Sequence, residues 1–200
     1  MTETHDFSNT RLEARFCGVG GQGIVLGSGI LASAAIFQEG KYATQSPTFG
    51  SQVRGGPTKV DLIVDTKEIL YPKATNINFF FATAQISFNK YFYDIADDCV
   101  ILVDANVVAQ LPEAVTSNKA YTLFKLPVLD MAKNEFKNPI LANMICLGIT
   151  QEVTQVVSKE ALLAAVERAV PKKHLQANFD AVEKGIELAK SRQKFEQVAV

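Results

Sequence analysis

Apolar residues recur along the chain in two patterns, one typical of strands and the other of helices. Over residues 11–18, Leu12, Ala14 and Phe16 alternate with polar or charged neighbours until a run of glycines begins. This pattern predicts a strand that leads into a tight turn. Residues 23–38 then carry apolar side chains on nearly every face, together with many small ones. They are therefore expected to form a buried helix that lies close to a sheet.

The remaining elements follow from shorter runs. Continuous apolar runs over residues 78–82 and 100–103 predict strands that are buried on both faces. Further strands are expected over residues 42–44, 60–64, 68–71 and 121–126, with a hairpin across 65–67 and a loop over 45–59. Helices are expected over residues 84–95, 128–136, 140–149, 159–169 and 175–190.

Strands and helices alternate through most of the chain, and the last third is helical. Ser158 is a good N-cap for the helix over 159–169, and Pro171 follows the end of that helix. The sequence therefore predicts an α/β fold, a doubly wound Rossmann-like sheet with a C-terminal helical region. We expect a flexible N-terminal arm over residues 1–10 and a single domain over residues 11–195.

The composition argues against several classes of protein. The 200 residues carry a net charge of -1 with no cluster of basic residues, so no nucleic-acid partner is expected. No apolar run reaches the ~20 residues that a membrane span needs, and the N-terminus does not have the pattern of a signal peptide. A cytoplasmic protein is the resulting expectation. The three cysteines are widely spaced and the two histidines lie far apart, which argues against a metal or iron–sulfur site held by this chain alone.

Residues 18–23 read Gly-Val-Gly-Gly-Gln-Gly and fit the pattern G-x-G-x-x-G between a strand and a helix. Bare amides at a helix N-terminus carry partial positive charge, so this turn is a candidate phosphate site. Its candidate ligand-binding residues are Gly18, Gly20, Gly21, Gln22 and Gly23. The alternative is that the glycines only permit a tight turn and close packing. Standard dinucleotide binding is disfavoured, because Glu39 comes too early to be the carboxylate that would hold the ribose.

A second candidate segment lies over residues 44–58 and contains a single arginine, Arg54. The guanidinium fork of an arginine suits phosphate or carboxylate, and hydroxyl groups lie upstream of it. The candidate residues in this segment are Thr44, Ser46, Arg54, Gly55 and Gly56. The alternative is an ordinary surface loop with a solvated arginine. Two weaker candidates are Cys17, which precedes the glycine turn, and Asp104, which ends a buried strand.

The two glycine motifs together resemble one family. Gly18–Gly23, followed by Thr44, Ser46 and Arg54-Gly55-Gly56, is similar to the gamma subunit of the 2-oxoacid:ferredoxin oxidoreductases, and the resemblance covers roughly residues 11–190. The helix that contains Asn143-Met144 and Leu147-Gly148 matches in kind. Many relatives carry Glu where this chain has Gln52, which puts in doubt any ion pair with Arg54 there.

The resemblance implies a role in a multi-subunit enzyme that oxidatively decarboxylates a 2-oxoacid and passes the acyl group to coenzyme A. Thiamine diphosphate, Mg and iron–sulfur clusters would lie in partner subunits, named alpha, beta and a ferredoxin-like delta, with ferredoxin or a similar protein as electron acceptor. This chain would be inactive alone and would bind coenzyme A or close the active site. Its alternatives are a non-catalytic assembly subunit and a stand-alone nucleotide-binding oxidoreductase. The oxoacid could be 2-oxoglutarate, which we favour, pyruvate, a branched-chain oxoacid, phenylglyoxylate or indolepyruvate.

Overall fold

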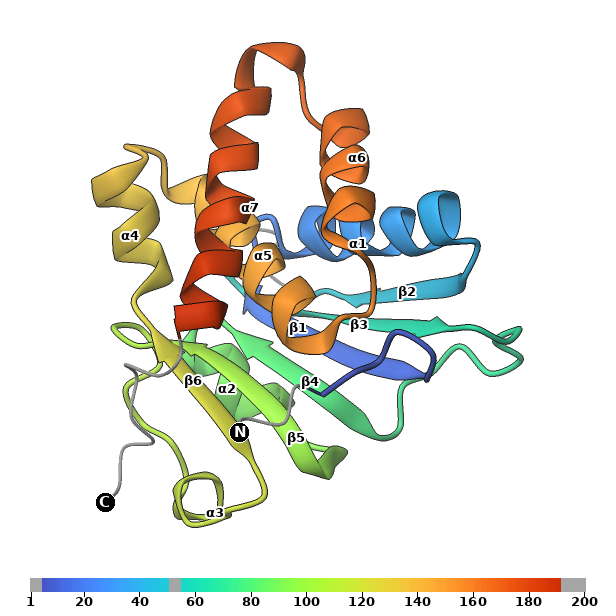
Figure 1. The fold of residues 1–200 in the computed structure, drawn as a ribbon. Coiled ribbons are helices and arrows are strands. Elements are labelled where there is room, and N and C mark those ends of the chain that lie inside the picture. Colours follow the sequence, from blue (N-terminus) through green and yellow to red (C-terminus); the bar gives the residue numbers. More distant parts are fainter. Residues whose placement is uncertain (1–4, 51–54, 192–200) are drawn as a thin grey trace.

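The computed structural model describes residues 5–50 and 55–191 and is built around a six-stranded sheet (Figure 1). The strands are β1 (Leu12–Val19), β2 (Tyr42–Thr48), β3 (Pro57–Asp65), β4 (Ile77–Ala82), β5 (Ile95–Asp104) and β6 (Thr122–Leu126). The helices are α1 (Ile24–Glu39), α2 (Gln85–Tyr91), α3 (Glu113–Thr116), α4 (Val128–Glu135), α5 (Ala142–Thr154), α6 (Lys159–Ala169) and α7 (Leu175–Lys190), with short 3-10 helices at Pro139–Leu141 and Lys172–His174.

The sheet is mixed, with the strand order β2-β3-β1-β4-β5-β6. Strands β1, β4, β5 and β6 are parallel, whereas β3 is antiparallel to both β1 and β2. Leu12 at the start of β1 lies opposite Val64, and Val19 at its end lies opposite Pro57. The end of β1 and the start of β3 therefore lie at the same edge of the sheet, which places the two glycine motifs side by side.

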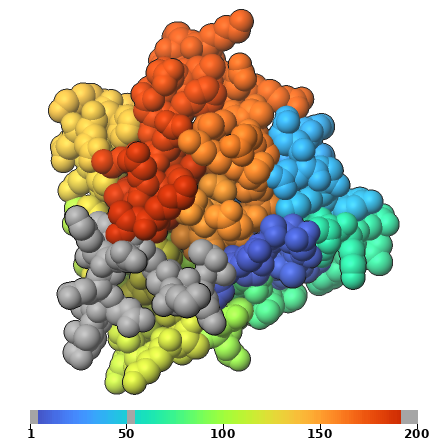
Figure 2. Space-filling model, viewed as in Figure 1, coloured from blue at the N-terminus to red at the C-terminus, as the bar shows by residue number. Residues whose placement is uncertain are grey.

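Helices cover the two faces of the sheet unequally. On one face, α1 and α4 to α7 form a thick layer, and Figure 2 shows the orange-to-red C-terminal helices as one continuous surface. Phe79 and Phe81 point into this layer, whereas Phe80 between them packs against Phe88 of α2 on the other face. The expected α/β fold with a C-terminal helical region is confirmed, and the antiparallel β2–β3 hairpin is the feature that the sequence did not predict.

Two glycines let α5 and α7 cross at very close range. A Cβ on Gly148 would lie 2.0 Å from the carbonyl oxygen of Val182, and a Cβ on Gly185 would lie 2.0 Å from that of Ile145. Any larger residue would therefore push the helices apart. This crossing fixes α5, whose N-terminal end reaches the glycine turn after β1.

Several element boundaries differ from those expected. Strand β2 extends to Thr48 because its ladder with β3 continues into the segment that was expected to be a loop, with Pro47 tolerated on an edge strand. The strand expected over 68–71 is absent from the described residues, and Leu70 is 86% exposed there. The helix expected over 84–95 ends at Tyr91, since Asp94 has a φ of 56° and Ile95 begins β5.

The C-terminal helices confirm the expectations most closely. Helices α6 and α7 have the expected bounds, and the Ser158 hydroxyl accepts the Ala161 N–H at 3.2 Å, as an N-cap should. At the other end of the chain, part of the proposed flexible arm is anchored. The Phe7 N–H donates to the carbonyl oxygen of Thr154 at 2.8 Å, and the Phe7 ring packs on the core.

Candidate functional site

The chain between β1 and α1 makes a tight turn that only glycine can follow. Gly21 and Gly23 have φ values of 99° and 73°, in the left-handed region that L side chains rarely adopt. Gly18 is required for space, because a Cβ there would lie 2.6 Å from Gln22 Oε1 and 2.8 Å from Thr83 Oγ1. The glycines of the motif therefore serve the shape of the turn directly.

The side chain of Gln22 folds back into the turn and stabilises it. Gln22 Oε1 accepts the backbone N–H of Val19 at 2.9 Å and the hydroxyl of Thr83 at 2.8 Å. Ser87, on α2, donates its hydroxyl to the Gly18 carbonyl oxygen at 2.5 Å. These contacts turn the carbonyl group of the Gln22 side chain toward the protein, and its expected role in ligand binding stays a prediction.

The second glycine motif pairs with the first through the backbone. The Gly20 N–H donates to the Gly56 carbonyl oxygen at 3.0 Å, and the Gly55 N–H donates to the Gly20 carbonyl oxygen at 3.3 Å. The structure thus brings together the two motifs that the sequence analysis combined. Arg54 and Gln52 lie outside the described residues, so their proposed roles remain predictions.

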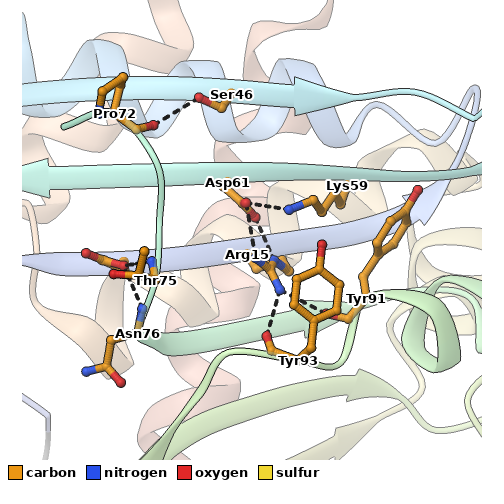
Figure 3. Close-up of polar contacts among 10 residues, drawn as sticks. Arg15, Ser46, Lys59, Asp61, Pro72, Thr75, Asn76, Tyr91 and Tyr93 are labelled. Carbon is orange, nitrogen blue, oxygen red and sulfur yellow. Dashed lines mark hydrogen bonds and ion pairs between the residues drawn. The ribbon is translucent and has the colours of Figure 1, made fainter.

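Thr44 and Ser46 lie apart from the glycine turn. The residue between them, Gln45, points toward α1 and donates to the Val25 carbonyl oxygen at 2.8 Å and to the Ser28 hydroxyl at 2.7 Å. Because side chains alternate along a strand, Thr44 and Ser46 face the opposite side of the sheet. Ser46 donates its hydroxyl to the Pro72 carbonyl oxygen at 3.2 Å on that side (Figure 3).

A groove of about 750 Å³ begins at the turn and runs along α1. Backbone of the turn forms one end, and apolar side chains form most of the remaining wall. It is lined by Val19, Gly20, Gly21, Gly23, Ile24, Val25, Leu26, Gly29, Ile30, Ser33, Phe49, Thr58 and Ala169. Leu26 and Phe49 are 50% and 65% exposed at its mouth. The groove therefore joins a polar backbone end to an apolar channel.

The partial positive charge at the N-terminal end of α1 is not neutralised by a side chain of its first turn. Throughout this helix, which is fully within the described residues, no side chain caps the first turn and no acidic residue lies in it. The amides of the first turn have no partner within an α-helix, and the helix dipole places partial positive charge there. This end of the groove is suited to an anion.

Arg15, on β1, forms a buried charged cluster on the face of the sheet opposite the groove. Its guanidinium donates to both carboxylate oxygens of Asp61 at 2.6 and 3.1 Å, and Lys59 Nζ lies 2.6 Å from the same carboxylate (Figure 3). Tyr93 covers the guanidinium at 4.3 Å and accepts from it through its carbonyl oxygen. Burial lowers the pKa of Arg15, but Asp61 more than offsets this effect and holds the pKa above its usual value. The cluster braces β1 against β3 and the Tyr93 turn.

The weaker candidates have structural surroundings. Burial raises the pKa of the Cys17 thiol, so that the thiolate needed for nucleophilic chemistry is scarce. Asp104 accepts the backbone N–H groups of Asn106 and Leu129 at 3.0 and 2.8 Å, which makes it a cap for the turn and for the start of α4. Glu39 accepts the Ser158 N–H at 2.5 Å and joins the end of α1 to the start of α6.

The sheet order bears on dinucleotide binding. In the dinucleotide-binding Rossmann fold, a parallel second strand next to β1 presents its carboxyl end beside the glycine turn. Here the antiparallel β3 takes that place and β2 lies at the edge of the sheet.

Within residues 5–50 and 55–191, no cluster of three or more His, Cys, Asp or Glu side chains could hold a metal ion. In the same ranges, no helix is both long and apolar enough to cross a membrane.

Sequence reasoning missed the contacts that hold the turn from other elements, including that of Asn143, which it had noted only as part of a helix similar to the family. Thr83, Ser87 and Asn143 all contact residues 18–23, and Asn143 donates its side-chain amide to the Gln22 carbonyl oxygen. They lie on other elements, so no local spacing could have identified them.

The sequence model of the family described as pyruvate ferredoxin/flavodoxin oxidoreductase matches residues 13–188. The 2-oxoglutarate synthase subunit KorC of Methanocaldococcus jannaschii is 36% identical over 182 residues, which cover 90% of this chain and 95% of that protein. The gamma subunit of keto/oxoacid ferredoxin oxidoreductase from Geobacter sulfurreducens PCA has a TM-score of 0.78 at 34% identity, over 90% of this chain and 99% of that chain. The 2-oxoglutarate:ferredoxin oxidoreductase from Magnetococcus marinus, solved with 2-oxoglutarate, coenzyme A and succinyl-CoA bound, has a TM-score of 0.80 at 22% identity, over 92% of this chain and 32% of that longer chain. This last likeness is one of fold.

Proposed function

Because this chain belongs to the pyruvate ferredoxin/flavodoxin oxidoreductase family as a gamma subunit, we propose that its groove receives coenzyme A in a complex that oxidises 2-oxoglutarate. In the overall reaction, the 2-oxoacid and the thiol of coenzyme A give acyl-CoA, carbon dioxide, a proton and a pair of electrons. The electrons pass to ferredoxin or a similar acceptor. Support for 2-oxoglutarate comes from the identity with the KorC subunit of a 2-oxoglutarate synthase.

Partner subunits are proposed to hold the remaining cofactors. The described residues offer no ligand set for an iron–sulfur cluster, since Cys17, Cys99 and Cys146 are each buried in different elements. Thiamine diphosphate, Mg and iron–sulfur clusters would lie in alpha, beta and ferredoxin-like delta subunits. Thiamine diphosphate would supply the carbanion chemistry of decarboxylation. This chain would contribute binding and closure.

One observation carries the coenzyme A proposal: the groove joins bare amides to an apolar channel. Coenzyme A has the same division, with anionic phosphates followed by a long and less polar arm. We infer that phosphate oxygens accept hydrogen bonds from the turn and from the first turn of α1. The arm would lie along Val25 and Ile30, beneath Phe49. A ligand seated there and covered by a neighbouring subunit would be shielded from water. Arg54 would add a charged contact and remains a prediction from the sequence.

The proposal is tested by filling the groove without straining the protein. Gly29 lines the groove and a Cβ there meets only the side chain of Gln45, at 3.7 Å, so Gly29→Leu is chosen to add bulk at this wall. Gln38→Leu is the matched control, because Gln38 is an exposed residue of the same helix outside the groove. Both variants are reconstituted with the partner subunits, and steady-state kinetics are measured with coenzyme A and with 2-oxoglutarate.

We expect Gly29→Leu to raise the KM for coenzyme A about tenfold, equivalent to about 1.4 kcal/mol. The KM for 2-oxoglutarate and the native mass of the complex should stay unchanged, as should all parameters of Gln38→Leu. An unchanged KM for coenzyme A in an intact complex would refute the coenzyme A site. If Gly29→Leu instead releases this chain from the complex, the face is an assembly surface, which is the alternative function.

The choice of oxoacid is tested on the unmodified complex. We expect 2-oxoglutarate to give a higher kcat/KM than pyruvate, branched-chain oxoacids, phenylglyoxylate or indolepyruvate. Reduction of a dye in place of ferredoxin separates the oxoacid preference from the choice of electron acceptor. A higher kcat/KM for any other oxoacid would contradict the proposed substrate and leave the coenzyme A site untouched.

A further inference from the structure

The peptide between Gln22 and Gly23 is held from α5, an element far away in the sequence. Asn143 stands in the first turn of α5, is 8% exposed and donates its side-chain amide to the Gln22 carbonyl oxygen. Only glycine fits at position 23, since a Cβ there would lie 2.7 Å from Asn143 Nδ2. This contact joins the C-terminal helical layer to the glycine turn.

The direction of one peptide bond follows from this contact. In a planar trans peptide, the C=O and the N–H point in opposite directions, and the described residues contain no cis peptide bond. Since Asn143 holds the Gln22 carbonyl toward α5, the N–H of Gly23 points away from α5. Gly23 lines the groove, whereas Asn143 does not. The contact therefore aims an amide without placing its own side chain in the groove.

We propose that Asn143 is a positioning residue for the anionic end of the groove's ligand. It holds the Gln22–Gly23 peptide so that the Gly23 N–H and the amides that open α1 face one bound group. This inference rests on the proposed coenzyme A site and adds the residue that orients it. Asn143 acts through the peptide and makes no contact with the ligand.

Two features make this arrangement firm and chemically specific. Helix α5 cannot shift easily toward α7, because the two backbones are in direct contact where they cross at Gly148 and Gly185. A neutral amide donates a hydrogen bond without adding charge near an anion site. An aspartate of the same shape would face the Gln22 carbonyl with an acceptor, which would turn the peptide away and place a negative charge near the ligand.

The test is Asn143→Asp in the reconstituted complex, with Asn178→Asp as a matched control. Asn178 is 7% exposed and donates its side-chain amide to the His174 carbonyl oxygen at 2.8 Å, on α7, outside the groove. The two substitutions make the same chemical change at equal burial. Kinetic constants are measured for coenzyme A and for 2-oxoglutarate, the dissociation constant of coenzyme A is measured by calorimetry, and thermal unfolding reports stability.

We expect Asn143→Asp to raise the KM and the dissociation constant of coenzyme A about tenfold, with less than a twofold change in kcat and in the KM for 2-oxoglutarate. Asn178→Asp should lower the melting temperature to a similar extent and leave coenzyme A binding unchanged. If both variants weaken coenzyme A equally, Asn143 has a structural role only and the inference is wrong. If Asn143→Asp does not assemble, Asn143→Ala is measured against Asn178→Ala, and equal coenzyme A constants for that pair also overturn it.

Comparison with Gly29→Leu separates this inference from the proposed function. If Gly29→Leu weakens coenzyme A binding and Asn143→Asp does not, the groove is the site but Asn143 does not orient it. If neither variant changes coenzyme A binding, the groove is not the site and both proposals fail.

Discussion

Replacing Gly148 by alanine is expected to destabilise the protein, because the added methyl group has no space at the crossing of α5 and α7. Its Cβ would lie 2.0 Å from the Val182 carbonyl oxygen and 3.0 Å from the Ile186 nitrogen. Cβ atoms essentially never approach closer than 3.0 Å, so the helices must separate by at least about 1 Å at this point. The buried contacts of Ile145 and Ile149 on the same interface would loosen with them.

The magnitude follows from two opposing effects. Overpacking in a well-packed core costs about 1–3 kcal/mol and occasionally more, and a clash with rigid backbone belongs at the upper end of that range. Alanine recovers up to about 1 kcal/mol of helix propensity relative to glycine. We therefore expect a net loss of about 2 kcal/mol in the free energy of unfolding. For a domain of this size, that corresponds to a melting temperature lower by about 4–8 °C.

The assay is urea unfolding of the isolated chain followed by circular dichroism, with thermal unfolding as a second measurement. Gly29→Ala is the matched control, since it makes the same change in a helix interior where a Cβ has only ordinary contacts at 3.7 Å or more. It should leave stability unchanged or raise it by up to about 1 kcal/mol. If Gly148→Ala proves as stable as Gly29→Ala, the close crossing does not exist in solution.

Two further predictions concern titratable groups. Burial alone would raise the pKa of Glu39, but the hydrogen bonds from Ser158 and the ion pair with Lys41 hold it below its ordinary value of 4.5. A lowered pKa stabilises the folded state at pH values above the ordinary one, and this stabilisation is lost as the pH falls through the folded value. The difference in unfolding free energy between the wild type and Glu39→Gln should therefore be larger at pH 7 than at pH 4, and a constant difference in urea unfolding would contradict this. Burial also raises the pKa of the Cys17 and Cys146 thiols, so neither should react with a disulfide reagent at pH 8 until urea unfolds the chain. Rapid labelling of the native protein, located by peptide mapping, would refute that expectation.

Local patterns predicted the elements whose signals are local. Helices α6 and α7 have the expected bounds because amphipathic periodicity, the Ser158 cap and Pro171 all act within a few residues. Likewise, the glycine turn was found because strand, glycines and helix are contiguous. The order of the strands was not predictable in this way, since an apolar run shows that a strand is buried and not which neighbour it pairs with.

The missing parts of the site depend on contacts between distant segments. Nothing near Asn143 indicates that its amide reaches Gln22, and only the folded chain brings them together. Arg15 was counted among the polar positions of an alternating strand, which usually face solvent, but Asp61 and Tyr93 cover it. The alternation of side chains along a strand would have placed Thr44 and Ser46 on the face of the sheet away from α1, had Gln45 been recognised as the residue that faces this helix.

The crossing of α5 and α7 also affects how the protein is made. The glycine turn leaves the ribosome before α5, and α7 follows α5. Until α7 emerges, α5 lacks the helix that packs against Gly148. The position of Asn143, which donates to the Gln22 carbonyl oxygen of the turn, is then not fixed by this packing. The turn therefore acquires its supported geometry only after α7 has been synthesised. A chain that stops before α7 would contain every glycine of the motif but lack the support that gives the motif its shape.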